Sequence, residues 1–193
     1  MGKERLLAFT DGVLAIVITI MVLELKAPHE ASFEALGEML PIFLSYVLSF
    51  VYVGIYWNNH HHMFQLVERV SGGMLWANLA LLFFLSLIPF TTAWMDETHG
   101  ETAPVALYGI SLLGPGIAYY ILQLVTIRAQ DNDDLKTALG SDLKGKLSPL
   151  IYLAGIALAF VSTWAAIAVY VVVALIWLVP DRRIERHLAA KRA

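Results

Sequence analysis

The chain has 193 residues, of which 59% are hydrophobic and only 15% are charged, and its formal net charge is −3. Soluble globular proteins carry roughly 25% charged residues, so this composition excludes a water-soluble domain and indicates an integral membrane protein. The sequence contains no cysteine, which excludes disulfides, catalysis by a thiol and thiolate metal sites.

The first apolar segment opens with Arg5-x-x-x-Phe9-Thr10-Asp11-Gly12 and then runs without charge from Val13 to Leu23. We predict a membrane helix over about residues 5–25, because roughly 20 mostly apolar residues cross a bilayer. An ionisable residue inside such a helix is a candidate functional residue. The orientation of Asp11 therefore matters for any interpretation of this chain.

Helical periodicity separates two faces of this first helix. At about 100° per residue, Asp11 projects roughly 140° away from Ile16. A stripe of apolar side chains with one hydroxyl shares the face of Ile16 and contains Ile16, Thr19, Ile20 and Leu23. The sequence predicts that Asp11 points into the protomer and that the stripe points elsewhere. From periodicity alone, the stripe is a lipid contact or a core face.

Four more uncharged stretches follow the first helix. Three of them are long enough for one membrane helix each. The last stretch is too long for one upright helix and short for two, but Ser162-Thr163-Trp164 provides a polar break with an interfacial aromatic residue. Pro89 and Gly114-Pro115-Gly116 are possible kinks. The predicted helices cover about residues 40–66, 73–94, 105–127, 149–164 and 165–179.

Basic residues indicate the orientation in the membrane. With six helices and the amino terminus in the cytoplasm, all but one of the 13 lysines and arginines lie on inner segments, and the exception is Lys26. This is a strong positive-inside bias, whereas five helices would place the basic residues after Pro180 outside. We therefore predict one all-α domain, residues 1–193, with six transmembrane helices, both termini in the cytoplasm and a polar inner segment at 128–146.

This topology brings polar residues of different helices to one depth near the inner face. Polar groups in lipid must pair with one another, because no water is present to replace a missing partner. We expect the carboxylate of Asp11 to point towards His60 and Asn78. The whole layer contains Arg5, Thr10, Asp11, Trp57, Asn58, Asn59, His60, His61, His62 and Asn78.

The three consecutive histidines 60–62 suggest a metal site, since imidazole is a common zinc ligand. However, adjacent residues of a helix point about 100° apart and cannot all face one ion. We therefore expect no metal and no cofactor, and favour a structural polar network over a pH-sensing role. We also expect no enzyme activity, because the sequence has no credible nucleophile–base pairing and no glycine-rich phosphate loop.

The opening motif resembles the RxxxFSD signature of the transmembrane-protein-175 family, which contains the lysosomal potassium channel and its prokaryotic relatives. Further support comes from Trp57-x-x-His60-x-x-x-Phe64, from Asn78 and from Ile88-Pro89-Phe90-Thr91-Thr92. The sequence departs from the signature at Thr10, where the family usually has serine. Both residues carry a hydroxyl, so we expect little consequence.

The resemblance implies a six-helix protomer that assembles as a homotetramer around a pore lined by the first helix. It also implies that the pore narrows at apolar rings, which fall here on Ile16, Ile20 and Leu23, with Thr19 as a hydroxyl ring. The chain lacks a TVGYG filter, so a ring of isoleucines would gate by dewetting. The implied signature network contains Arg5, Phe9, Thr10, Asp11, Trp57, His60 and Asn78.

The resulting functional prediction is a potassium-permeable cation channel of weak-to-moderate K⁺ over Na⁺ selectivity. It would lie as a multi-pass protein in a prokaryotic inner membrane, with lipid, monovalent cations and its own copies as partners and no nucleic acid. Two alternatives stay open. One is a proton-coupled secondary carrier that uses Asp11 and a histidine of the second helix, and the other is a non-conducting assembly protein.

Overall fold

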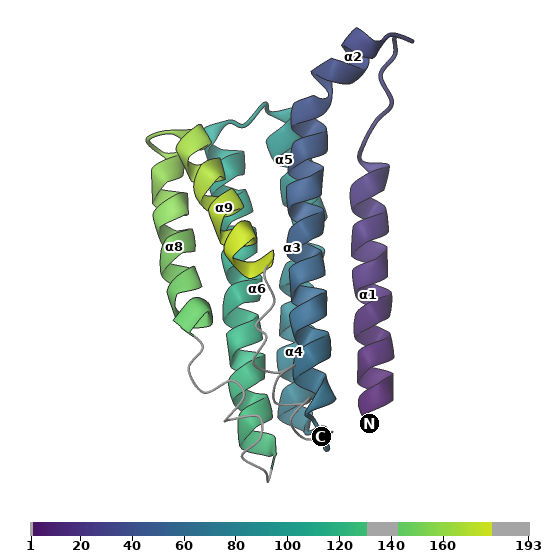
Figure 1. Ribbon diagram of the computed structural model, residues 1–193, viewed down its shortest axis with the longest axis vertical. Coiled ribbons are helices and arrows are strands. Elements are labelled where there is room, and N and C mark those ends of the chain that lie inside the picture. Colours follow the sequence, from purple (N-terminus) through teal and green to yellow (C-terminus); the bar gives the residue numbers. More distant parts are fainter. Residues whose placement is uncertain (1, 131–142, 179–193) are drawn as a thin grey trace, which may run out of the picture.

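The computed structural model describes residues 2–130 and 143–178, and in these ranges the chain consists of helices and connecting loops without a strand (Figure 1). The all-helical prediction is therefore confirmed for the described residues. The helices are α1 (Lys3–Leu23), α2 (Phe33–Glu38), α3 (Leu40–Gln65), α4 (Gly72–Ser86), α5 (Ile88–Glu97), α6 (Thr102–Ala129), α8 (Leu143–Ala159) and α9 (Thr163–Leu178).

Within the described residues, four helical segments are long and apolar enough to cross a membrane. They are α1, α3, the continuous pair α4–α5 from Gly72 to Glu97, and α6. The last two helices are shorter, with 17 residues in α8 and 16 in α9. They pack against one another and, in Figure 1, form a hairpin at the edge of the bundle opposite α1.

The turn between α8 and α9 covers residues 160–162 and overlaps the predicted polar break only at Ser162, because Thr163 and Trp164 already belong to α9. The chain leaves α8 at Phe160, and the amides of Val161 and Ser162 both donate to the carbonyl of Leu158, at 2.9 and 2.8 Å. The Ser162 hydroxyl then accepts from the amide of Ala165 at 3.4 Å, which caps the start of α9.

The predicted bounds of α8, residues 149–164, are wrong at both ends. The helix begins at Leu143, so that Pro149 lies inside it, and it ends at Ala159. Both ends of the predicted inner segment 128–146 are therefore helical. Arg128 still belongs to α6, and residues 143–146 belong to α8. Residues 131–142 of that segment, and the carboxyl terminus from residue 179, lie outside the described residues.

The predicted third helix is divided at Leu87. Pro89 occupies the first turn of α5, where its missing amide hydrogen is tolerated, whereas inside a continuous helix its ring would clash with a preceding carbonyl. The second possible kink is not a break, because α6 continues through Pro115. The sequence also gave no indication of α2, a short helix capped by the Ser32 hydroxyl, which accepts from the amide of Ala35 at 3.1 Å.

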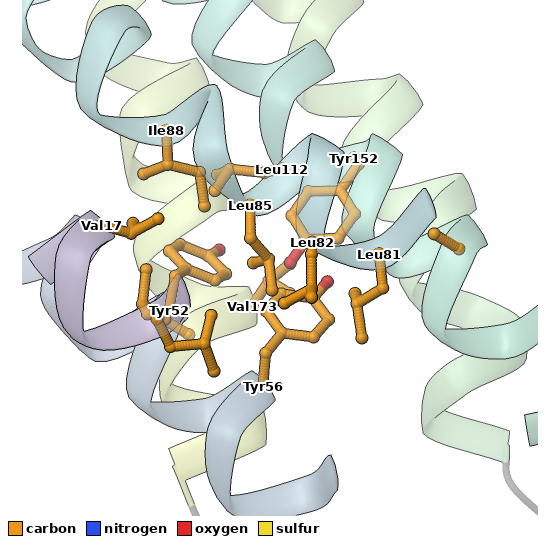
Figure 2. Packing of buried hydrophobic residues seen from close by; sticks show 14 of the residues in the cluster. Val17, Tyr52, Tyr56, Leu81, Leu82, Leu85, Ile88, Leu112, Tyr152 and Val173 are labelled. Atoms are coloured by element: carbon orange, nitrogen blue, oxygen red, sulfur yellow. The ribbon is translucent and has the colours of Figure 1, made fainter. Parts of the chain in front are cut away.

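The core lies between α3, α4, α6, α8 and α9, and four fully buried tyrosines contribute to it: Tyr52, Tyr108, Tyr152 and Tyr170. Figure 2 shows Tyr52, Tyr56 and Tyr152 among leucines of α4 and α6, with Val17 entering from α1. Glycines allow the close approach of α6 to α9, because a Cβ at Gly109 would lie 2.1 Å from the Tyr170 hydroxyl oxygen. Helix α1 lies at the edge of this core, on α3, α4 and α5.

Candidate functional site

Helix α1 has one buried face and one exposed face. Its buried residues, Leu6, Thr10, Leu14, Val17 and Met21, follow a spacing of three and four residues and pack on the rest of the protomer. The opposite side presents large apolar side chains to the surroundings. Ile16 is 61% exposed, Ile20 43% and Leu23 74%. The stripe identified from periodicity therefore points away from the protomer, as predicted.

Thr19 belongs to this exposed face. Its hydroxyl donates to the carbonyl of Ala15 at 2.7 Å, so its oxygen presents free lone pairs to the surroundings. Arg5 and Phe9 are also exposed, and at about 100° per residue they share the side of Ile16. The exposed face therefore runs along most of α1, from a guanidinium near its start to Leu23 at its end.

A buried polar network joins α1, α3 and α4. The Asn78 side-chain amide donates to the Thr10 hydroxyl at 2.9 Å, and the Asn78 carbonyl oxygen lies 2.9 Å from Nε2 of His60. Because that oxygen can only accept, His60 must carry its proton on Nε2. All three residues are at most 3% exposed, and the His60 ring stacks on Phe64 with centroids 4.4 Å apart. Three helices are thus linked by hydrogen bonds between buried side chains.

The prediction for Asp11 is wrong in its direction. Its carboxylate does not reach into the protomer but is exposed, and it accepts from the indole Nε1 of Trp57 at 3.0 Å. Thr10, the preceding residue, takes the buried position beside Asn78. The physical reason is that Thr10 lies in the middle of the buried face of α1, whereas Asp11 is about 100° further round and faces the flank of α3.

The three consecutive histidines differ in burial: His60 is buried, His61 is exposed, and His62 is half-buried with its ring edge-on to that of His61. His60 belongs to the buried network, whereas His61 is exposed, lies 3.0 Å from the side-chain amide of Gln65 and stacks on Trp57. Trp57 therefore contacts both Asp11 and His61 on the outside of the protomer. Asp11 and the buried imidazole of His60 therefore have different hydrogen-bond partners, Trp57 and Asn78.

A second polar network was missed by the sequence analysis. The Ser49 hydroxyl lies 2.7 Å from the Thr92 hydroxyl and 2.9 Å from the Tyr108 hydroxyl, and joins α3, α5 and α6. Next to it, Thr91 pairs with Ser111 at 2.8 Å. The signal was the spacing of Ser45 and Ser49, which places both hydroxyls on one side of α3. These contacts give the two threonines after Pro89 a structural role.

Comparison with known proteins relates this arrangement to a family. The family model described as "Endosomal/lysosomal potassium channel TMEM175" matches residues 5–89. A protein from Chryseobacterium sp. (strain P1-3) named as a potassium channel is 55% identical over 189 residues, which cover 97% of this chain and 98% of that protein. The chicken endosomal/lysosomal proton channel TMEM175 is 33% identical over 117 residues, 52% of this chain and 23% of that protein.

A solved structure supports the same relation. The crystal structure of a lysosomal potassium-selective channel TMEM175 homolog from Chamaesiphon minutus superposes with a TM-score of 0.78 and 28% identity, and covers 93% of this chain and 97% of that one. The family and these relatives are channels and not enzymes. Together with several helices that can cross a membrane, this makes the chain an integral, multi-pass membrane protein. The chain belongs to the TMEM175 family.

Proposed function

We propose that this chain is a potassium-permeable cation channel, in which four copies surround a pore lined by α1. The observation that carries the proposal is the exposed stripe of α1. Ile16, Ile20 and Leu23 are among the exposed large apolar side chains, although they belong to a helix whose other face is packed tightly into the protomer. Relatives of the same length are named potassium channels, which supports this assignment.

Around a fourfold axis, the stripe would form successive rings. Ile16 and Ile20 would build narrow apolar constrictions that gate by dewetting, and Leu23 a further ring at the end of the helix. The Thr19 oxygens, between these rings, would contact partly dehydrated cations. Such a path favours K⁺ over Na⁺ only weakly to moderately, because Na⁺ holds its water more strongly. The exposed carboxylates of Glu24 and Glu30 would concentrate cations at the outer end.

The proposed topology has six membrane helices, with α8 and α9 as the two short ones and both termini in the cytoplasm of a bacterial inner membrane. The basic residues support this orientation, because only Lys26 lies on a segment assigned to the outside. The start of α1 is then cytoplasmic, where Lys3 donates to the carbonyl of Val67 at 2.9 Å and holds the start of α1 to the end of α3.

The test is cation flux into liposomes that contain the purified protein. Ile16→Asn should raise K⁺ flux and reduce the preference for K⁺ over Na⁺, because a wetted ring removes the dehydration barrier. Thr19→Val should alter ion preference more than total flux. Val22→Asn is the matched control: Val22 is 45% exposed but lies about 120° from Ile16 around the helix. Unchanged flux in Ile16→Asn, or the same effect in Val22→Asn, contradicts a pore along this stripe.

The carrier alternative is less well supported by the geometry. A proton relay from Asp11 needs a histidine of α3 in hydrogen-bond contact with it, but Asp11 pairs with Trp57, His60 with Asn78 and His61 with Gln65. Cation flux that rises in proportion to the applied voltage supports a channel. Saturating flux that requires a proton gradient supports the carrier, and no flux from folded protein supports an assembly role.

A further inference from the structure

A cavity of about 180 Å³ lies at the C-terminal end of α1, where α1 meets α3 and α5. This is the upper end of these helices in Figure 1, away from the polar layer around Asp11. The cavity is separate from the exposed stripe of α1, because it is lined from that helix by the buried Met21 and by the residues that follow Leu23. The cavity shares Glu24 with the outer end of the proposed permeation path and Thr92 with the buried network around Ser49, but no residue of the exposed stripe lines it.

The cavity has an apolar floor and an acidic rim. Met21 of α1, Ile42 of α3 and Ala93 of α5 provide the floor. Three carboxylates line its rim, from Glu24, Asp96 and Glu97, and outnumber the one lysine there, Lys26; His99 also lines the cavity.

Only one of these carboxylates is matched by a cation within the described part of the chain. Glu97 lies 3.7 Å from Nζ of Lys26, and both side chains of this ion pair are largely exposed. Asp96 is partly buried, and one of its oxygens accepts from the Ser45 hydroxyl at 2.5 Å. That bond fixes the Asp96 side chain between α3 and α5 but leaves its charge uncompensated. The rim therefore favours a positively charged group.

The size and lining of the cavity restrict what can occupy it. A water molecule has a share of about 30 Å³ in the liquid, so the space corresponds to several waters, but it is smaller than the roughly 300–1,000 Å³ of a drug-sized site. No group of three or more potential metal ligands converges anywhere in the described residues, which argues against a bare divalent ion. An anion would be repelled by the rim, and a purely apolar molecule would leave the carboxylates unused.

We propose that this cavity binds a small amphiphilic ammonium compound. Its apolar part lies on Met21, Ile42 and Ala93, and its ammonium group lies between Asp96 and Glu24. The ring of Tyr46 lines the same cavity and can contribute a cation–π contact. The occupant touches α1, α3 and α5 together, so binding adds contacts that the unliganded protein lacks.

The test is ligand-induced thermal stabilisation of the purified protein in detergent at mildly alkaline pH. Benzylammonium is the probe, and benzyl alcohol, of the same shape without the charge, is its comparison. Benzylammonium should raise the melting temperature saturably, because a ligand that binds only the folded state stabilises it. Benzyl alcohol should produce a much smaller shift.

Charge variants locate the site. Asp96→Asn keeps an oxygen that can accept from Ser45, and Glu24→Gln changes an exposed side chain, so both variants should fold. Each should weaken benzylammonium binding by about five- to tenfold, as the loss of one charge contact near a surface predicts. Ala93→Leu should fill the floor and weaken it by at least as much. Glu34→Gln on α2 is the control, because it removes an outer carboxylate that does not line the cavity.

Equal stabilisation by benzylammonium and benzyl alcohol overturns the proposal, since the acidic rim would then have no role. An equal loss of affinity in Glu34→Gln and Asp96→Asn also overturns it, because general surface charge would explain the binding. The assay measures binding without transport. Its failure is therefore distinguishable from a failure of the proposed channel function.

Discussion

Asn78→Ala tests the buried network in which one amide holds three helices together. The substitution removes both hydrogen bonds of the Asn78 side chain, each 2.9 Å long, to Thr10 and to His60. These two partners are 1% and 3% exposed. Neither can therefore turn to water when the amide is missing.

The expected loss of stability follows from the two groups left behind. A buried polar group without a partner costs about 1–3 kcal/mol, but hydrogen bonds between membrane helices contribute only about 0.6 kcal/mol on average, because the unfolded chain in the membrane also finds partners. We expect Asn78→Ala to lower the free energy of unfolding by about 2–4 kcal/mol. Thr10→Val should cost about half as much. The double variant should lose about 1 kcal/mol less than the sum, because both changes break the same bond.

Unfolding in mixed micelles, as sodium dodecyl sulfate is increased, measures these differences. Asn58→Ala is the matched control, since Asn58 is on α3 at the same level but outside the network. Its free energy of unfolding should remain within about 0.5 kcal/mol of the wild type. If Asn78→Ala and Asn58→Ala are equally stable, or if the double variant is strictly additive, the network does not act as one unit and the reasoning is refuted.

Two further predictions use the same titration. Gly109→Ala would place a Cβ 2.1 Å from the Tyr170 hydroxyl oxygen and should lower the free energy of unfolding by about 1–3 kcal/mol through overpacking. Gly37→Ala is the control and should not destabilise the protein, because no atom lies within 4 Å of the added Cβ. Equal effects of the two variants would exclude close packing of α6 on α9 as the cause. Trp57→Phe removes the indole that donates to Asp11 and should lower the free energy of unfolding by about 1 kcal/mol. In protein that already carries Asp11→Ala, the same change should have no further effect. If Trp57→Phe destabilises both backgrounds equally, a direct Trp57–Asp11 pairing is contradicted.

The sequence determined the helical class, the order of the long helices and the exposure of one face of α1. These features are local, because hydropathy over about 20 residues indicates a membrane helix and a repeat of 3.6 residues assigns side chains to faces. The repeat predicted that Ile16 and Leu23 share one face, and the structure shows that this face is exposed. The polar residues that begin at Ser162 indicated the break between α8 and α9. The opening signature, together with Trp57, His60 and Asn78, was enough to predict the family.

The tertiary structure alone decided which polar groups meet. Topology placed Thr10, Asp11, His60 and Asn78 at one depth, but depth does not fix how each helix is rotated towards its neighbours. Asn78 meets Thr10 and not Asp11 because α4 packs on the buried face of α1, whereas Asp11 faces the flank of α3. The cavity beside the end of α1 depends in the same way on three helices far apart in the sequence. Contacts of this kind depend on helix packing, which no local pattern encodes.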